Sequence, residues 1–194
     1  GSEMCIRDSH EIASPDIHVD IFIVEPTAER NYYTLVTSGM GAHRMNVPKE
    51  LAEYKLERAE IVVYLPADWN ISDHEEKNYW PLRWLKILAR LPLEEDSWLG
   101  WGHSVPNGKP FAENTQLSSV LLINPENVEE GAAVCQLPNG EEVNFYQMIP
   151  LYEEEVNFKI QNGAETLLGK MGEISAVVDI HRLNVCEGFG RPKE

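Results

Sequence analysis

The sequence predicts an α+β (mixed α/β) domain in which a largely antiparallel or mixed sheet of about six strands packs with three or four helices. Several short segments alternate apolar and polar residues, as half-buried strands do. Asn139-Gly140 separates two such segments and favours a tight β-hairpin. Helical spacing is confined to a few segments that do not alternate regularly with the strands, which argues against a doubly wound sheet.

The N-terminal half contains three expected strands. Residues 17–24 alternate, with the apolar side chains at positions 17, 19, 21 and 23 on one face. Residues 31–37 are rich in β-branched and aromatic residues, and the glycines of Ser38-Gly-Met-Gly41 end them. We expect these two strands to form an antiparallel hairpin. Residues 58–65 finish in a nearly continuous apolar run, which predicts a strand at the centre of the sheet, buried on both faces.

A helix is expected to begin at Trp80 and to end at Pro92. Pro81 suits a first helical turn, and apolar residues recur at positions 80, 84, 87, 88 and 91. The opposite side carries three basic residues, Arg83, Lys86 and Arg90. We interpret them as a solvated face that pairs with the acidic residues at positions 94–96.

The second half adds three expected strands, over residues 116–123, 132–137 and 141–149. A helix is expected over residues 151–160, because the glutamates at 153–155 would lie in its first turn, where negative charge stabilises the helix dipole. Asn162-Gly163 separates it from a second helix over residues 164–171. A further helix is expected within residues 173–185.

The length of 194 residues fits a single domain. Residues 1–9 have the character of a tag scar followed by a translated leader, so they are excluded from the fold. We expect one domain over residues 10–185 and a loose tail over residues 186–194.

The formal net charge of −16 restricts the class of partner. Binding to phosphate groups needs a basic surface, so nucleic acid and anionic membranes are not expected partners. A basic protein would be attracted, although the same charge also serves solubility. The three cysteines form no close pair, and no apolar run reaches the roughly 20 residues of a membrane helix. We therefore expect a cytoplasmic protein; the sequence leaves its oligomeric state open.

Motifs of catalysis and cofactor binding are missing from the sequence. GxGxxG, P-loop, HExxH, GxSxG and CxxC patterns do not occur. His18 and Asp20 share one strand face, but two ligands without a third do not define a metal site. We expect no catalytic residue, metal or cofactor. The alternative, a metal-dependent or hydrolytic enzyme, would use His18, Asp20, His43 and His103.

All five tryptophans lie between residues 69 and 101. Trp80 and Trp84 follow helical spacing and are expected in the core. Trp98 and Trp101 stand beside glycines in a polar loop, where periodicity does not explain them; they either anchor a partner or pin the loop to the domain. The candidate partner-binding residues are Trp98, Trp101, His103, Gly39, Gly41, His43 and Arg44.

Five stretches resemble the suppressor of fused domain. They are HEIASPDIHVD (10–20), NYYTLVTSGMG (31–41), WPLRWLKILAR (80–90), WLGWGHS (98–104) and FYQMIPLYEE (145–154). The resemblance runs from about His10 to Met171 and implies a non-enzymatic protein-binding domain. Animal members clamp an extended peptide between this domain and a second one. The chain ends soon after the first domain, so that clamp is not carried over.

The chain is more similar to bacterial single-domain members of that family. This resemblance implies an immunity protein that neutralises a polymorphic toxin, and the acidic charge would suit a basic toxin domain. A different hypothesis is a general peptide-binding module that adds a partner strand to an exposed sheet edge.

Overall fold

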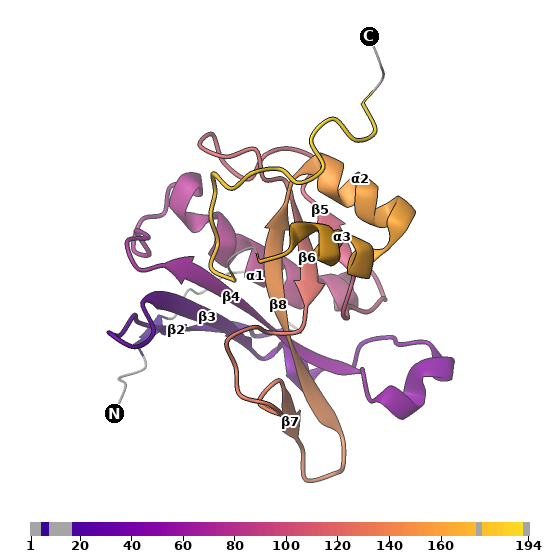
Figure 1. Ribbon diagram of the computed structural model, residues 1–194. Coiled ribbons are helices and arrows are strands. Elements are labelled where there is room, and N and C mark those ends of the chain that lie inside the picture. Colours follow the sequence, from indigo (N-terminus) through magenta and orange to yellow (C-terminus); the bar gives the residue numbers. More distant parts are fainter. Residues whose placement is uncertain (1–4, 8–16, 174–175, 192–194) are drawn as a thin grey trace.

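The computed structural model describes residues 5–7 (backbone only), 17–173 and 176–191. Within them, a sheet of eight strands has the order β1-β2-β3-β4-β8-β6-β5, and β7 also pairs with β8 (Figure 1). The strands are β1 (Cys5–Arg7), β2 (Asp20–Val24), β3 (Tyr32–Ser38), β4 (Arg58–Pro66), β5 (Ser104–Pro106), β6 (Ser119–Ile123), β7 (Val134–Gln136) and β8 (Glu142–Leu151). The helices are α1 (Glu76–Glu94), α2 (Glu153–Asn162) and α3 (Ala164–Met171), with short 3-10 turns η1 (Met40–Ala42) and η2 (Lys49–Tyr54).

The sheet is mixed, as predicted. β4 and β8 pair in parallel, whereas the other described pairs are antiparallel. The predicted β2–β3 hairpin is confirmed, with Asp20 opposite Ser38. The predicted turn at Asn139-Gly140 is confirmed too, because Cys135 lies opposite Val143 and Gly140 has a φ of 83°. One strand, β1, lies in residues that the sequence assigned to a leader.

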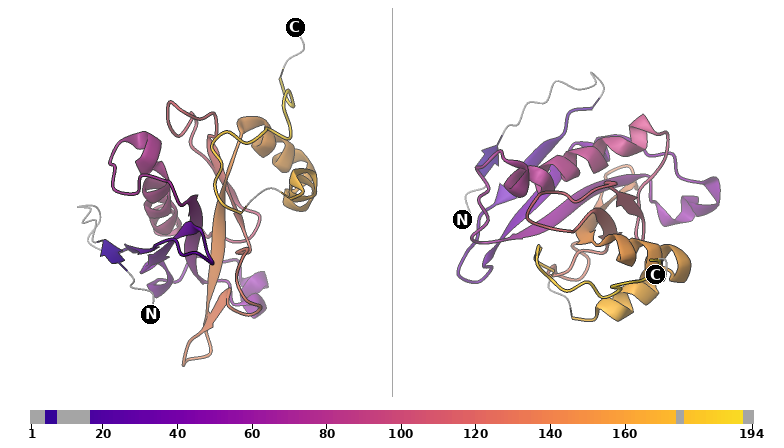
Figure 2. Two further views of the ribbon diagram at one scale, coloured as in Figure 1. Left: turned by 60° about the vertical axis from the view of Figure 1, so that its left-hand side comes forward. Right: turned by 90° about the horizontal axis from the view of Figure 1, so that it is seen from above.

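Helices cover both faces of the sheet. Figure 2 shows α1 on one side and α2 with α3 on the other. Val120 and Leu122 of β6 therefore join the core that contains Trp80, whereas Leu121 and Ile123 pack with Leu167 of α3. This two-sided cover explains why every residue of β6 is buried and why its sequence does not alternate.

The bounds of α1 differ from the prediction. The helix begins at Glu76, one turn before Trp80, and continues through Pro92 to Glu94. The Glu95 N–H still donates to the Leu91 carbonyl at 2.9 Å, so Pro92 does not end the helix. A proline inside a helix removes one donated hydrogen bond and crowds the preceding turn, but the residues that follow it can still donate their own.

The predicted solvated face of α1 is wrong. Lys86 and Arg90 are buried, with 3% and 8% of their surfaces exposed. The Lys86 ammonium donates to the Tyr79 hydroxyl at 2.8 Å and lies over the Tyr79 ring. Arg83 is exposed and pairs with Glu76. Long aliphatic stems let basic side chains pack under a covering layer while their charged ends find polar partners.

The helix expected within residues 173–185 is absent from the described part of that range, residues 173 and 176–185. Residues 176–185 form an irregular segment, here called the C-terminal strap. Its backbone is held by hydrogen bonds from Gln147 to the Ala176 carbonyl, from Val178 to the Tyr64 carbonyl and from Thr115 to the Ile180 carbonyl. Packing continues beyond the strap, because Cys186 is buried and Phe189 lies edge-to-face against Phe158.

Candidate functional site

The Trp98–His103 turn is fastened to strand β6. The Gly102 N–H donates to the Leu122 carbonyl at 2.7 Å, and the Leu122 N–H donates to the His103 carbonyl at 2.9 Å. Within the turn, the Trp98 and His103 rings meet edge-to-face with centroids 4.4 Å apart. Trp98 packs partly buried against the main core. Trp101 keeps 40% of its surface exposed, so it is presented to solvent more fully than Trp98.

The surroundings of His103 favour the neutral form of its imidazole. Burial lowers its pKa, and the nearby Lys159 ammonium lowers it further. The Gly100 N–H donates to His103 Nδ1 at 3.2 Å, which leaves the proton on the other nitrogen. Lys159 donates to the Ser104 hydroxyl at 3.1 Å, and its own pKa is lowered by burial.

The turn that contains Gly39 and Gly41 closes around a buried carboxylate. Both glycine N–H groups donate to Glu60 Oε1 at 2.9 Å, and the Thr37 hydroxyl donates to Oε2. Burial raises the pKa of Glu60 despite these hydrogen bonds. Gly39 has a φ of 117°, and a Cβ there would lie 2.1 Å from the His18 carbonyl oxygen. The two glycines therefore shape the backbone of the turn.

Arg44 belongs to a separate surface network. It pairs with Glu141 at 2.5 Å, and Arg58 contacts the other oxygen of the same carboxylate at 3.1 Å. Asn139 and then the two arginines lower the pKa of Glu141. His43, next to Arg44, is half-buried. Neighbouring residues link the two predicted regions: Met45 accepts the Leu99 N–H through its sulfur at 3.4 Å, and the Asn46 N–H donates to the Ser97 carbonyl at 3.1 Å.

The residues of the alternative enzyme hypothesis form no shared centre. His18 Nε2 lies 3.1 Å from Asp20 Oδ1 at the exposed start of β2, whereas His103 is bonded within its own turn. Across residues 5–7, 17–173 and 176–191, no group of three or more His, Cys, Asp and Glu side chains could hold a metal. The helices of this part of the chain include none long and apolar enough to cross a membrane.

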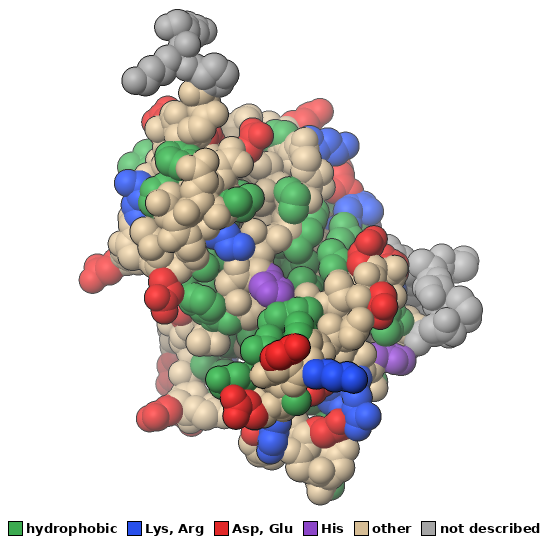
Figure 3. Space-filling view, turned by 90° about the vertical axis from the view of Figure 1, so that its right-hand side faces the viewer, with side chains coloured by type: hydrophobic (Ala, Val, Ile, Leu, Met, Phe, Trp, Pro, Cys, Tyr) green, Lys and Arg blue, Asp and Glu red, His purple; other side chains and the backbone are tan. Residues whose placement is uncertain are grey.

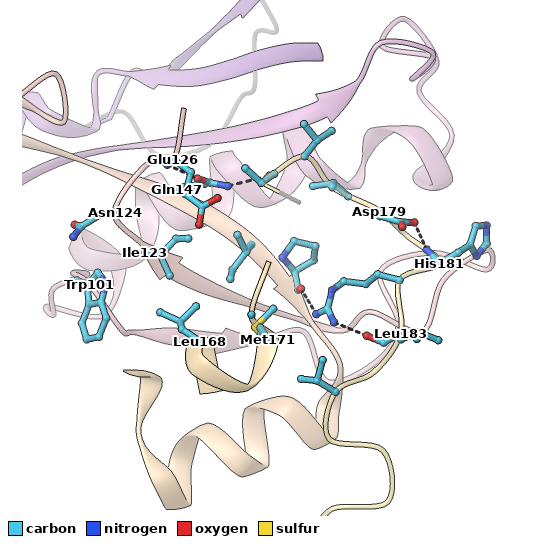
Figure 4. A pocket seen from close by; sticks show the side chains of 18 residues that line it. Trp101, Ile123, Asn124, Glu126, Gln147, Leu168, Met171, Asp179, His181 and Leu183 are labelled. Carbon is cyan, nitrogen blue, oxygen red and sulfur yellow. Dashed lines mark hydrogen bonds between the residues drawn. The ribbon is translucent and has the colours of Figure 1, made fainter. Parts of the chain in front are cut away.

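A cavity of about 740 Å³ opens beside Trp101 (Figure 4). Its floor comes from β6 and β8, one wall comes from α3 and the other wall is the C-terminal strap. Apolar side chains dominate the lining: Ile123, Ile149, Leu168, Met171, Val178 and Val185. Sequence reasoning missed this cavity, because the strap has no periodic pattern. The sequence feature that could have indicated the cavity was Trp101, an aromatic residue that helical or strand spacing does not explain.

Buried polar groups fix the walls of the cavity. Gln147 accepts the Glu126 N–H at 2.9 Å and donates to the Ala176 carbonyl at 3.0 Å. Arg182 donates to the Pro150 carbonyl at 2.9 Å and to both oxygens of Glu155. These bonds join the strap to β8 and α2. The walls of the cavity are thus held together by hydrogen bonds within the folded chain.

The surface beside α2 and α3 is mixed in character. Figure 3 shows hydrophobic side chains gathered across the middle of the face that looks to the right in Figure 1, with acidic and basic side chains around them. An apolar centre with a charged border is typical of surfaces that bind other proteins.

The fold is a mixed sheet covered by helices on both faces, and an apolar cavity opens beside Trp101. The family model described as Suppressor of fused protein (SUFU) matches residues 15–183. The chain therefore belongs to the suppressor of fused family, and the resemblance seen in its motifs is confirmed.

Relatives of known sequence or structure agree with this assignment. An uncharacterised protein of Ureaplasma parvum, UU111, is 27% identical over 175 residues, which cover 90% of this chain and 82% of that protein. The crystal structure of a protein assigned as a SUFU homologue from Neisseria gonorrhoeae superimposes with a TM-score of 0.66 at 19% identity, covering 94% of this chain and 88% of that one. These similarities support the fold.

Two further structures have the same fold. Drosophila Suppressor of Fused gives a TM-score of 0.60 at 15% identity, covering 86% of this chain but 42% of the Drosophila chain. The structure of a Sufu–Fu complex gives a TM-score of 0.59 at 15% identity, covering 86% of this chain and 76% of that one. In that complex, the fold is part of a protein–protein assembly.

Proposed function

We propose that this chain is a non-enzymatic, cytoplasmic protein-binding domain that recognises a basic protein, and that it serves as an immunity protein against a bacterial toxin. The observation that carries the proposal is Trp101, 40% exposed at the mouth of a preformed apolar cavity. Exposed tryptophans beside such cavities are the usual anchors of protein interfaces. The net charge of −16 favours a basic partner, because complementary fields speed association.

Binding by strand addition has less support than binding at the cavity. The outer strands β1 and β5 and the short strand β7 have three residues each: Cys5–Arg7, Ser104–Pro106 and Val134–Gln136. Short edge strands, one of them ending in proline, offer few backbone groups to an incoming strand. The cavity beside Trp101 offers a larger and more apolar contact.

The test is binding to the toxin domain encoded beside the gene in its native host. Titration calorimetry should detect a complex, and Trp101→Ala should weaken it at least about ten-fold. Tyr54→Ala is the matched control, since Tyr54 is also an exposed aromatic residue, 59% exposed, but does not line the cavity. Circular dichroism should show both variants folded.

A growth assay separates immunity from binding in general. Cells that express the toxin should survive with the wild-type chain and with Tyr54→Ala, and should lose protection with Trp101→Ala. Absence of binding to every neighbouring gene product, together with normal growth of a deletion strain under toxin exposure, would overturn the immunity role.

A further inference from the structure

We propose that the cavity between α3 and the C-terminal strap binds a short apolar segment of the partner that is flanked by basic residues. This inference rests on the proposed function and specifies the chemistry of its contact. The occupant follows from three properties of the described residues: the lining of the cavity, the charges at its border and the rigidity of its walls.

The apolar lining of the cavity favours an apolar segment of the partner. Ile123 from the sheet lies opposite Leu168 and Met171 from α3, and Trp101 lies at one end (Figure 4). Ile149 also lines the cavity. A volume of about 740 Å³ lies within the range of sites that enclose a compact ligand, so it admits more than one side chain. Burial of apolar surface would supply the binding free energy.

Acidic residues at the border of the cavity favour a partner segment that is flanked by basic residues. Glu126 and Asp179 are exposed at the border of the cavity. The one arginine in the lining, Arg182, already uses both terminal nitrogens on Glu155 and on backbone carbonyls. Asp179 Oδ1 accepts the His181 N–H at 3.0 Å, which leaves its negative charge at the border. A fatty acid bound in the cavity would bring its own carboxylate against the Glu126 and Asp179 carboxylates, whereas lysine or arginine side chains would be attracted.

Hydrogen bonds and an ion pair within the chain hold the walls of the cavity. Gln147, with 1% of its surface exposed, links the two sides of the cavity through its Glu126 and Ala176 hydrogen bonds. Arg182 and Glu155 fix the far end of the strap. A preformed cavity spends little free energy on ordering, so even a short segment can bind measurably.

The experiment uses capped hexapeptides and the full chain. The first probe is Lys-Lys-Leu-Leu-Lys-Lys, and matched peptides replace either the leucines with serine or the lysines with glutamate. Binding is followed by tryptophan fluorescence and by 1H–15N NMR. We expect the first peptide to shift amide signals of β6, α3 and the strap, and both matched peptides to bind at least about ten-fold more weakly.

Variants locate the contact. Leu168→Arg places a charge in the cavity and should abolish peptide binding; Leu168→Gln gives the same readout if the arginine variant fails to fold. Ile160→Arg is the control, because Ile160 is 70% exposed on α2 and does not line the cavity. The double variant Glu126→Gln, Asp179→Asn should bind the basic peptide more weakly, and its binding should depend less on salt concentration.

The outcomes separate this inference from the proposed function. If the toxin binds and tolerates Leu168→Arg while no peptide binds, the cavity assignment is overturned and the binding function stands. If the basic peptide binds as expected but no neighbouring toxin does, the cavity assignment stands and the immunity role fails. Tighter binding of lauric acid than of the basic peptide would instead make the cavity a lipid site and overturn the inference.

Discussion

Arg182 and Glu155 form a two-point ion pair that fastens the C-terminal strap to α2. The side chains are 8% and 0% exposed, and the Glu155 carboxylate also accepts the Tyr152 and Val185 N–H groups. The Arg182 guanidinium lies over the Tyr152 ring, 5.0 Å from its centroid. One ion pair thus joins the helix start, the end of β8 and the wall of the cavity.

Arg182→Ala should lower the free energy of unfolding by about 3–5 kcal/mol, because it leaves the buried Glu155 carboxylate without its cation. Urea denaturation followed by circular dichroism measures the change. Arg191→Ala is the matched control: Arg191 pairs with Glu154 but is 68% exposed, so its loss should cost less than about 1 kcal/mol. Equal costs for the two variants would contradict a structural role for the buried pair.

Gly39→Ala should destabilise the fold far more than Gly131→Ala. Gly131 also has a positive φ, 84°, but open space surrounds its Cβ position, so the left-handed backbone alone costs about 1–2 kcal/mol. At Gly39 the Cβ would overlap the His18 carbonyl oxygen and force the turn apart, costing more than about 3 kcal/mol. Similar melting temperatures for the two variants would show that the turn adjusts and that Gly39 is not needed there.

Local patterns in the sequence predict the elements well, but they do not predict how distant elements pack. The alternation of residues 17–24 and the Asn139-Gly140 turn depend on neighbours in the chain, and both were confirmed. The burial of Lys86 depends on the layer packed over α1, which helical spacing does not encode. The parallel pairing of β4 with β8 is equally non-local.

The candidate site, too, combines features that the local sequence indicates with features that depend on the packing of distant elements. Trp101 was predicted to be a partner-binding residue because neither helical nor strand spacing accounts for it, and it is exposed at the cavity. Gly39 and Gly41 were selected as contact residues, but their N–H groups are used by Glu60, a partner about 20 residues away whose role no local pattern indicates. The cavity itself needs the strap to fold back over the sheet, and the strap has no periodic signal.

Glu60 should make stability depend on pH. Its pKa is raised by burial above the ordinary value of 4.5, so the folded state holds the proton more tightly than the unfolded state. The stabilising contribution is therefore present below pH 4.5 and is lost as pH rises through the raised pKa. Glu60→Gln keeps an acceptor for the Gly39 and Gly41 N–H groups but does not titrate. As pH rises from 4.5 through the raised pKa, the free energy of unfolding of the wild type should therefore fall relative to that of Glu60→Gln.

Urea denaturation at a series of pH values measures this difference. Glu53→Gln is the control, because Glu53 is exposed on η2 and should leave the pH profile unchanged. A wild type that gains stability over Glu60→Gln as pH rises would show that the hydrogen bonds from Thr37 and the glycines outweigh burial.

Lys159→Met should raise the pKa of His103 toward its ordinary value of 6.5 without restoring it fully. Burial is the larger cause of the lowered pKa and remains in the variant, whereas the repulsion from the Lys159 ammonium is removed. NMR titration of the His103 ring carbon signals measures the change. Lys170→Met is the control, since Lys170 lies over the Phe158 ring and is absent from the causes of the His103 shift.

The same shift has a consequence for stability. Because the folded state favours neutral His103, the stabilising contribution is present above pH 6.5 and is lost as pH falls through the lowered pKa. Lys159→Met should move this loss to higher pH. An unchanged or lower His103 pKa in the variant would mean that Lys159 does not act on the imidazole, and that burial in the Trp98–His103 turn accounts for its neutrality alone.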